Sequence, residues 1–444
     1  MAASSPAQPV VAERPIVHVV VQQHAEEAAL LRHVRSSLVR APHVGLLQLG
    51  RLDERIAAHL DGLAVAGKHG TAYCVAALER AGAGEVFALA VRAIESRDRK
   101  RLQQALALVG AAPDAARGIA SALGWVSASD LQGVGRELLA AGSASLRALG
   151  LTACRMHGVD PGPVLAAALH DEQAELRAAA LRTAAELGRV DLLPQARESI
   201  TSDNPELVFW AAWASCLLGD RQASLRVLAV AAAATHDTAP WAERALALAM
   251  LASPFDQASA LARSLSQAAQ TQADAARQRR LIRALGLLGD ARFVPWLIDR
   301  MSDPTLMRLA GEAFSWIAGV DLARADLETL QAPPRPEHPS DDPDDDDVSL
   351  DEDESLPWPD ADKIRAWWSR QASLQTAAAA GQRLFCGEPA SASAATRVLR
   401  EGTQRLRALA ALWLCVLQPG SKLFQVAAPT VRQQRWLGLQ ARAS

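Results

Sequence analysis

Few of the side chains that could do chemistry in this chain have a spacing that matches a known reaction. His24 and His33 flank Glu27 and could be written as a metal-binding cluster, but solvated or half-buried residues on a helix are the simpler interpretation. The sequence contains no GxxxxGK[ST], no GxGxxG after a strand, no GxSxG and no HExxH. We therefore expect no catalytic residues, no cofactor and no metal site.

The cysteines support the same conclusion. They are odd in number and no CxxC pair occurs, so neither a zinc site nor a redox motif has the right spacing. We expect buried free thiols in a reducing compartment. The five cysteines are Cys74, Cys154, Cys216, Cys386 and Cys415. The apolar run at 16–21 is too short for a signal peptide or a membrane span, so we expect a cytoplasmic protein with no membrane association.

Tryptophan provides the first candidates for binding a partner. Trp367 and Trp368 are adjacent on an expected helix, so their side chains point about 100° apart and are not expected to be buried together in one interface. Because Trp is enriched at binding hot spots, the pair could anchor a partner, and packing between repeats is an equal alternative. For Trp210, Trp213 and Trp316 we favour packing.

A second candidate is a group of arginines on one expected helix. Arg277, Arg280 and Arg283, with Arg279 between them, could form a basic stripe that binds a protein or a nucleic acid. A solvated face is the simpler interpretation. An intramolecular partner is also available, because an acidic tract follows later in the chain.

The elements that must position these residues are helices. Of 444 residues, 50% are hydrophobic and only 4% aromatic, and Ala and Leu dominate, which favours helix over sheet. A repeat is visible in which an Asp precedes a terminal Gly by 16 or 17 residues. The pairs are Asp171 with Gly188, Asp203 with Gly219, and Asp303 with Gly319, and weaker copies start at Ser143, Asp237 and Asp274.

We interpret each copy as a helix–turn–helix unit of about 30–36 residues, a typical solenoid period. The Asp or Ser caps the second helix, which is small and apolar enough to lie buried, and the Gly ends it in the left-handed conformation. Stacked units would share one continuous core. The sequence predicts an all-α solenoid, with a non-repetitive helical domain as the alternative.

This pattern resembles HEAT-like repeats of the type also found in phycobilisome lyases. In those repeats an Arg follows an apolar residue early in the second helix, as at Leu176-Arg177 and Met307-Arg308, whereas Val208-Phe209 departs from the pattern. The segments RLDERIAAHLDGL, WPDADKIRAWW, VLREGTQRLRALAAL and LFQVAAPTVRQQ are further similar to an uncharacterised bacterial family of HEAT-repeat proteins, over about residues 17–438. Members of that family are often encoded near type VI secretion genes. The family brings no known catalytic residues.

The expected organisation has five parts. Residues 1–16 are expected to be disordered, 17–110 to form an N-terminal helical cap with the first repeats, and 111–330 to form the HEAT-like solenoid. An acidic Pro/Asp-rich linker at 331–356 is expected to be disordered, because its charges repel and it has little apolar area to bury. Residues 357–444 are expected to form a C-terminal helical module of one or two more units.

The linker changes how the net charge of −3 is interpreted. It holds eleven acids and one Arg, so the rest of the chain has 45 basic and 38 acidic residues and is mildly basic.

Our main hypothesis is a non-enzymatic scaffold or adaptor that binds another protein and, as the resemblance implies, is accessory to loading type VI secretion effectors. A nucleic-acid-binding HEAT solenoid is the alternative. A phycobilin-lyase-like enzyme is a remote one, since no bilin pocket is visible in the sequence.

If the acidic tract masks the arginine stripe, deleting residues 338–354 should strengthen non-specific binding of a polyanion such as heparin, because basic side chains would be released. Affinity measured at low salt checks this. Unchanged binding would refute the masking.

Overall fold

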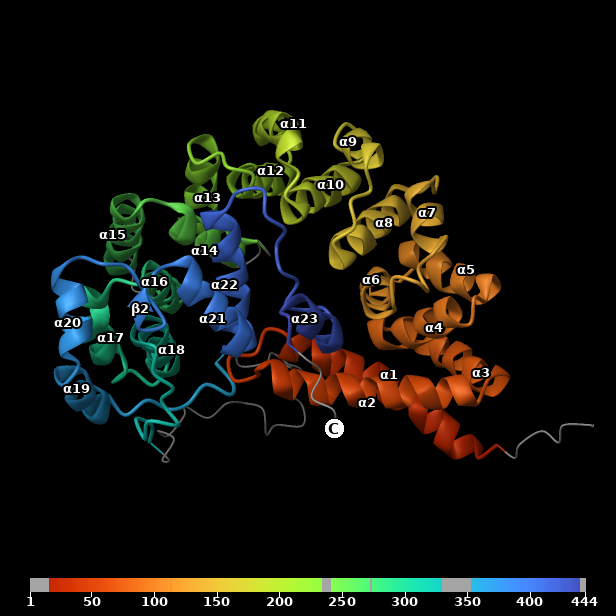
Figure 1. Ribbon diagram of the computed structural model, residues 1–444, viewed down its shortest axis with the longest axis horizontal. Helices are drawn as coiled ribbons and strands as arrows, with labels where there is room; N and C mark the ends of the chain where they lie inside the picture. The colour runs from red at the N-terminus through yellow and green to blue at the C-terminus, as the bar shows by residue number, and fades with distance from the viewer. Residues whose placement is uncertain (1–15, 113, 234–240, 272–273, 330–352, 440–444) are drawn as a thin grey trace, which may run out of the picture. The chain divides into compact units, whose positions relative to one another are not determined.

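A computed structural model describes residues 16–112, 114–233, 241–271, 274–329 and 353–439 (Figure 1). These residues form 23 α-helices with short 3₁₀ turns, which confirms the predicted all-α helical repeat fold. Their only sheet pairs two two-residue strands, β1 (Leu384–Phe385) and β2 (Glu388–Pro389), in antiparallel register. No helix in these ranges is long and apolar enough to cross a membrane.

The chain forms two compact units, described separately below. Unit 1 comprises residues 1–35 and 52–132, and unit 2 comprises residues 36–51 and 133–444. This division differs from the predicted ranges, because residues 36–51 group with the later repeats and residues 357–439 are part of unit 2. The predicted N-terminal tail and most of the predicted linker lie outside the described residues.

Unit 1 is built around a helix that is buried over most of its length. Two glycines allow neighbouring helices to approach this helix, α4, closely. Gly84 of α4 has no side chain and leaves room for the carbonyl of Ala29 on α1, and Gly118 of α6 leaves room for Val86 of α4. The helices of this unit, two of which continue into unit 2, are α1 (His18–Leu38), α2 (Leu46–Val65), α3 (Lys68–Ala76), η1 (Ala77–Arg80), α4 (Ala83–Glu95), α5 (Arg99–Ala107), η2 (Leu108–Gly110) and α6 (Ala115–Trp125).

Unit 2 contains the repeats as an outer and an inner row of helices (Figure 1). The outer row is α7 (Val134–Leu139), α9 (Pro163–Ala168), α11 (Leu193–Glu198), α13 (Ala223–Ala233), α15 (Phe255–Thr271) and α17 (Val294–Arg300), with η3 (Val190–Leu192), η4 (Ser199–Thr201) and η5 (Ala291–Phe293) beside it. The inner row is α8 (Ala144–His157), α10 (Ala174–Leu187), α12 (Pro205–Leu217), α14 (Ala242–Ala252), α16 (Ala275–Leu288) and α18 (Met307–Ala318). Each inner helix packs on the next, so their small apolar residues form one continuous core.

The predicted caps of the inner helices are correct only in part. The Asp274 carboxylate does accept a hydrogen bond from the Ala276 amide at the start of α16. In α12 the cap is Asn204 rather than Asp203, and the N-cap residue of α10, Gln173, makes no side-chain cap hydrogen bond. Asp171 instead accepts from the Gln173 amide within the preceding turn, and the predicted cap Asp237 lies outside the described residues.

The C-terminal segment runs back along the array. Its helices are α19 (Ala361–Ser369), α20 (Ala372–Ala379), α21 (Ala392–Glu401), α22 (Gln404–Leu417) and α23 (Thr430–Trp436). α22 packs beside α14, as its blue ribbon shows in Figure 1. The Leu384 amide donates to the Gly289 carbonyl (2.8 Å), and the Leu423 amide donates to the Glu186 carbonyl (2.9 Å). The segment therefore closes the carboxyl ends of α16 and α10, where helix carbonyls lack partners.

This return path makes one glycine more important than another of the same conformation. Gly158 and Gly289 both have left-handed φ angles, of 66° and 69°. A Cβ at Gly158 would meet nothing within 4 Å, whereas one at Gly289 would lie 2.0 Å from the Leu384 oxygen. We expect Gly158→Ala to destabilise by about 1–2 kcal/mol and Gly289→Ala by about 3 kcal/mol or more. Urea unfolding measures both, and equal losses would contradict the proposed close approach.

Candidate partner-binding face

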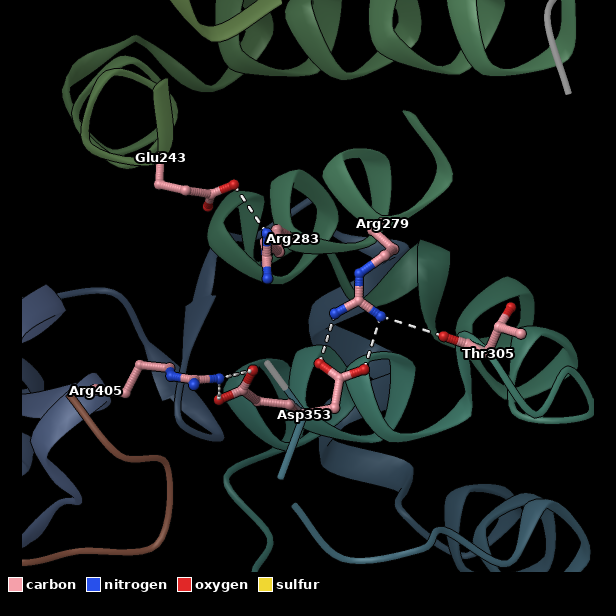
Figure 2. Close-up of polar contacts among 7 residues, drawn as sticks. Glu243, Arg279, Arg283, Thr305, Asp353 and Arg405 are labelled. Atoms are coloured by element: carbon pink, nitrogen blue, oxygen red, sulfur yellow. Dashed lines mark hydrogen bonds and ion pairs between the residues drawn. The ribbon is translucent and has the colours of Figure 1, made fainter. Parts of the chain in front are cut away.

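The predicted arginine stripe on α16 is half-buried and engaged with other parts of unit 2. Arg277 lies 3.7 Å from Asp274, and Arg283 donates to Glu243 of α14 (2.9 Å). Arg280 is half-buried on the same helix. Figure 2 shows Arg279 and Arg283 directed toward acidic partners on other elements. The stripe is thus a set of internal contacts rather than an open basic face, although its role in binding a partner stays a prediction.

The strongest of these contacts joins the stripe to the end of the predicted linker. Arg279 donates through two nitrogens to the two oxygens of Asp353, both at 2.7 Å, and also to the Thr305 carbonyl at 3.2 Å (Figure 2). Such bidentate pairs are the strong form of ion pair. Asp353 and Leu356 are buried in a turn, so the expectation of disorder is wrong for residues 353–356.

A second internal pair fixes α22 against the inner row. Arg405 donates to both oxygens of Glu312 on α18 at 2.8 Å, and it also reaches the carbonyl of Arg40 at 3.4 Å. Burial raises the pKa of Glu312, and Arg405 opposes that shift. The Gln404 amide donates to the Val44 carbonyl at 2.7 Å. These contacts hold the 36–51 segment against α22.

The predicted tryptophan pair lies on α19, and both side chains are half-buried. Trp367 packs edge-on against Phe314 of α18 with ring centres 5.8 Å apart, and Trp368 also packs against the core. Both therefore contribute to packing between α19 and the array. Their use as partner anchors stays a prediction.

A third tryptophan has a setting that the sequence analysis missed. Trp210 of α12, for which packing was favoured, has the guanidinium carbons of Arg182 and Arg244 over its ring at 5.0 and 5.6 Å from the centre. These three residues come from three consecutive inner helices. We call Arg182, Trp210 and Arg244 the Trp210 site.

The Trp210 site adjoins a buried ion-pair network. Glu186 accepts from Arg155 at 2.9 Å and from Arg182 at 2.7 Å. Burial opposes ionisation of Glu186, but these two arginines hold its pKa well below the usual range. Arg244 is exposed as a residue, but the protein groups around its guanidinium partly desolvate it. This desolvation, followed by the charge of Arg182, lowers the pKa of Arg244 to about 10. No sequence signal pointed to this cluster, because Arg155, Arg182, Trp210 and Arg244 are each about 30 residues from the next in the sequence.

The residues that could be written as a metal cluster, His24, Glu27 and His33, lie on α1 of unit 1. In the described part of the chain no three His, Cys, Asp or Glu side chains gather in a way that could hold a metal ion. In unit 1, His24 instead faces His59 of α2, with their Nδ1 atoms 3.1 Å apart. Gly62 makes room for the His24 ring, since a Cβ there would lie 2.5 Å from it.

The histidine pair predicts a pH effect on stability. Burial, followed by the charge of His24, lowers the pKa of His59 below its ordinary 6.5. As the pH falls, His59 therefore takes up a proton in the unfolded chain at a higher pH than in the folded chain. The stability of the folded chain, fully present above about pH 6.5, should fall as the pH drops below that value. Thermal melts of the full chain from pH 7.5 to 5.5 check this. The His59→Gln variant should lose less stability over the range, and an equal loss would show that other groups are responsible.

Comparisons with known proteins do not show a family for this chain. No protein-family model matches it, and no curated protein matches it. A solved structure that is similar to it is the crystal structure of an engineered protein, at 15% identity and a TM-score of 0.30, covering 90% of this chain and 99% of that chain. The sequential pairing of helices in unit 2 is that of a helical repeat protein.

Proposed function

We propose that this protein is a non-enzymatic scaffold or adaptor that binds another protein through the inner row of unit 2. The supporting observation is that successive inner helices place charged and aromatic side chains side by side, from Arg182 through Trp210 and Arg244 to Glu243 and Arg283. Arginine and tryptophan are the side chains that most often anchor protein interfaces. The resemblance to a family encoded near type VI secretion genes makes a secretion effector, or a protein that loads one, the partner class we expect in the cytoplasm.

Affinity capture from the native organism tests this proposal. The full chain used as bait should enrich one specific protein, and bait carrying Arg244→Glu should lose it. Bait carrying Arg226→Glu, a change at an exposed residue of the outer helix α13, should retain it. Capture of no specific protein, together with turnover of a small molecule by the purified chain, would overturn the proposal.

Nucleic-acid binding is the second candidate, supported by the excess of basic residues outside the linker. The carboxylates of Glu186, Glu243 and Glu312 lie among the inner-row arginines and would repel a phosphate backbone, so we rank it lower. It predicts DNA binding that weakens steeply with salt. Absence of a mobility shift at about 50 mM salt would exclude it.

A further inference from the structure

The Trp210 site rests on a rigid aromatic base. Phe209 lies between three indole rings, with ring centres 4.9 Å from Trp210, 5.9 Å from Trp213 and 5.8 Å from Trp241. Phe209 and Trp213 are buried. The base therefore has little freedom to rearrange. The guanidinium groups of Arg182 and Arg244 lie over the Trp210 ring, and Arg182 is also held by Glu186. A preorganised pair of guanidinium groups loses less entropy when it binds a ligand.

The site carries more positive charge than the protein neutralises. Arg40, Arg155 and Arg182 all act on Arg244 electrostatically, and Glu186 is the acidic residue that acts against them. Glu186 is already bonded to both Arg155 and Arg182. Arg244 is exposed, and among the described residues no carboxylate forms an ion pair with it. An anion placed here would therefore gain from several guanidinium groups at once.

Carboxylates fit this site better than nucleic acid does. A base would have to stack on Trp210, whose ring already has two guanidinium groups over it. The planar fork of Arg pairs with a carboxylate through two parallel bonds. The same chain forms such a pair between Arg279 and Asp353, with both bonds at 2.7 Å.

We propose that the Trp210 site binds an acidic, Asp- or Glu-rich segment of the partner protein, with a carboxylate on Arg244. This inference rests on the proposed function and specifies the chemistry of the partner. The occupant is assigned by charge complementarity. The chain's own aspartates between residues 341 and 347 are a rival occupant, which the experiment below distinguishes.

The test is fluorescence anisotropy of the full chain with a labelled twelve-residue polyglutamate peptide at low salt. We expect saturable binding that Arg244→Gln weakens about tenfold and Arg244→Lys weakens less, because Lys keeps the charge but loses the fork. Arg226→Gln should leave the affinity unchanged. All variants should melt close to the wild-type temperature, since the contact of Arg244 with the Trp210 ring is a cation–π contact of an exposed residue, which contributes little to stability.

Three results would overturn the proposal. The first is equal affinity of wild type and Arg244→Gln. The second is tighter binding of a labelled oligothymidine than of polyglutamate, with the loss again at Arg244. The third is no peptide binding by wild type but binding once the six aspartates between 341 and 347 become asparagine, which would make the chain's own tract the occupant. If affinity capture still finds a partner that ignores Arg244, the scaffold function stands and the Trp210 site alone fails.

Discussion

Replacing Arg407 by alanine is expected to lower the free energy of unfolding of unit 2 by about 3–5 kcal/mol. Arg407 is fully buried on α22. Its guanidinium donates to the Leu399 carbonyl at 2.8 Å, to the side-chain oxygen of Gln433 at 2.6 Å and to that of Gln404. Alanine would leave a cavity and three buried acceptors without this donor, and an unsatisfied buried group costs about 1–3 kcal/mol.

The loss should also loosen the C-terminal segment, because Gln433 in turn donates to the carbonyls of Val426 and Ala428. Urea unfolding followed by circular dichroism gives the stability, and hydrogen exchange should show faster opening of residues 418–436. Arg370→Ala, at an exposed residue of the same segment, is the control and should change little. A midpoint for Arg407→Ala equal to that control would contradict the structural role assigned to Arg407.

The second large effect is expected at Glu186, whose replacement by alanine should destabilise unit 2 by about 3–5 kcal/mol. The change leaves the buried guanidinium of Arg155 without its carboxylate. It also removes the acceptor for the Gln425 amide, which lies 2.7 Å from the Glu186 carboxylate. An uncompensated buried charge is the main penalty, so Glu186→Ala with Arg155→Met should lose less than the sum of the two single changes.

The pH dependence has a definite sign. Burial opposes the charged form, but Arg155 and Arg182 lower the pKa of Glu186 below that of the unfolded chain. The stabilisation is therefore present above about pH 4.5 and is lost as the pH falls further. Urea midpoints at pH 7 and pH 3.5 measure it, with Glu172→Gln, at an exposed residue, as the control. In the comparison of variants, a double variant Glu186→Ala with Arg155→Met that loses as much stability as the sum of the two single variants would show that Glu186 and Arg155 do not interact.

The sequence predicts the helices better than it predicts their contacts. Regular spacing identified the inner helices, and Gly188, Gly289 and Gly319 take left-handed angles at the predicted ends. Local signals sufficed there because a helix and its end are determined within a few residues. The cap of α12 was assigned one residue early, at Asp203 instead of Asn204, because both residue types cap helices well.

The return of the C-terminal segment could not be predicted from local pattern. Its contacts join distant residues, such as Arg383 with the Leu251 carbonyl and Gln425 with Glu186. The burial of Asp353 was missed for a related reason. A run of acids predicts a solvated chain, and only the position of Arg279 gives one of them a buried partner.

The Trp210 site shows the same limit. Trp210 was noticed as an aromatic residue, but its two arginines lie on neighbouring helices, and only the stacking of α10, α12 and α14 brings them over the ring. An apolar setting predicts packing for a tryptophan, and Trp213 is buried. What distinguishes Trp210 is the charge around it.

Site-specific photo-crosslinking in the native cell tests the central claim, that the inner row binds a protein, most directly. A photoreactive residue at position 243, an exposed site on the inner helix α14, should form an adduct with a single partner protein. The same residue at position 263, exposed on the outer helix α15, should not. Adducts from position 263 alone, or equally from both positions, would contradict the account.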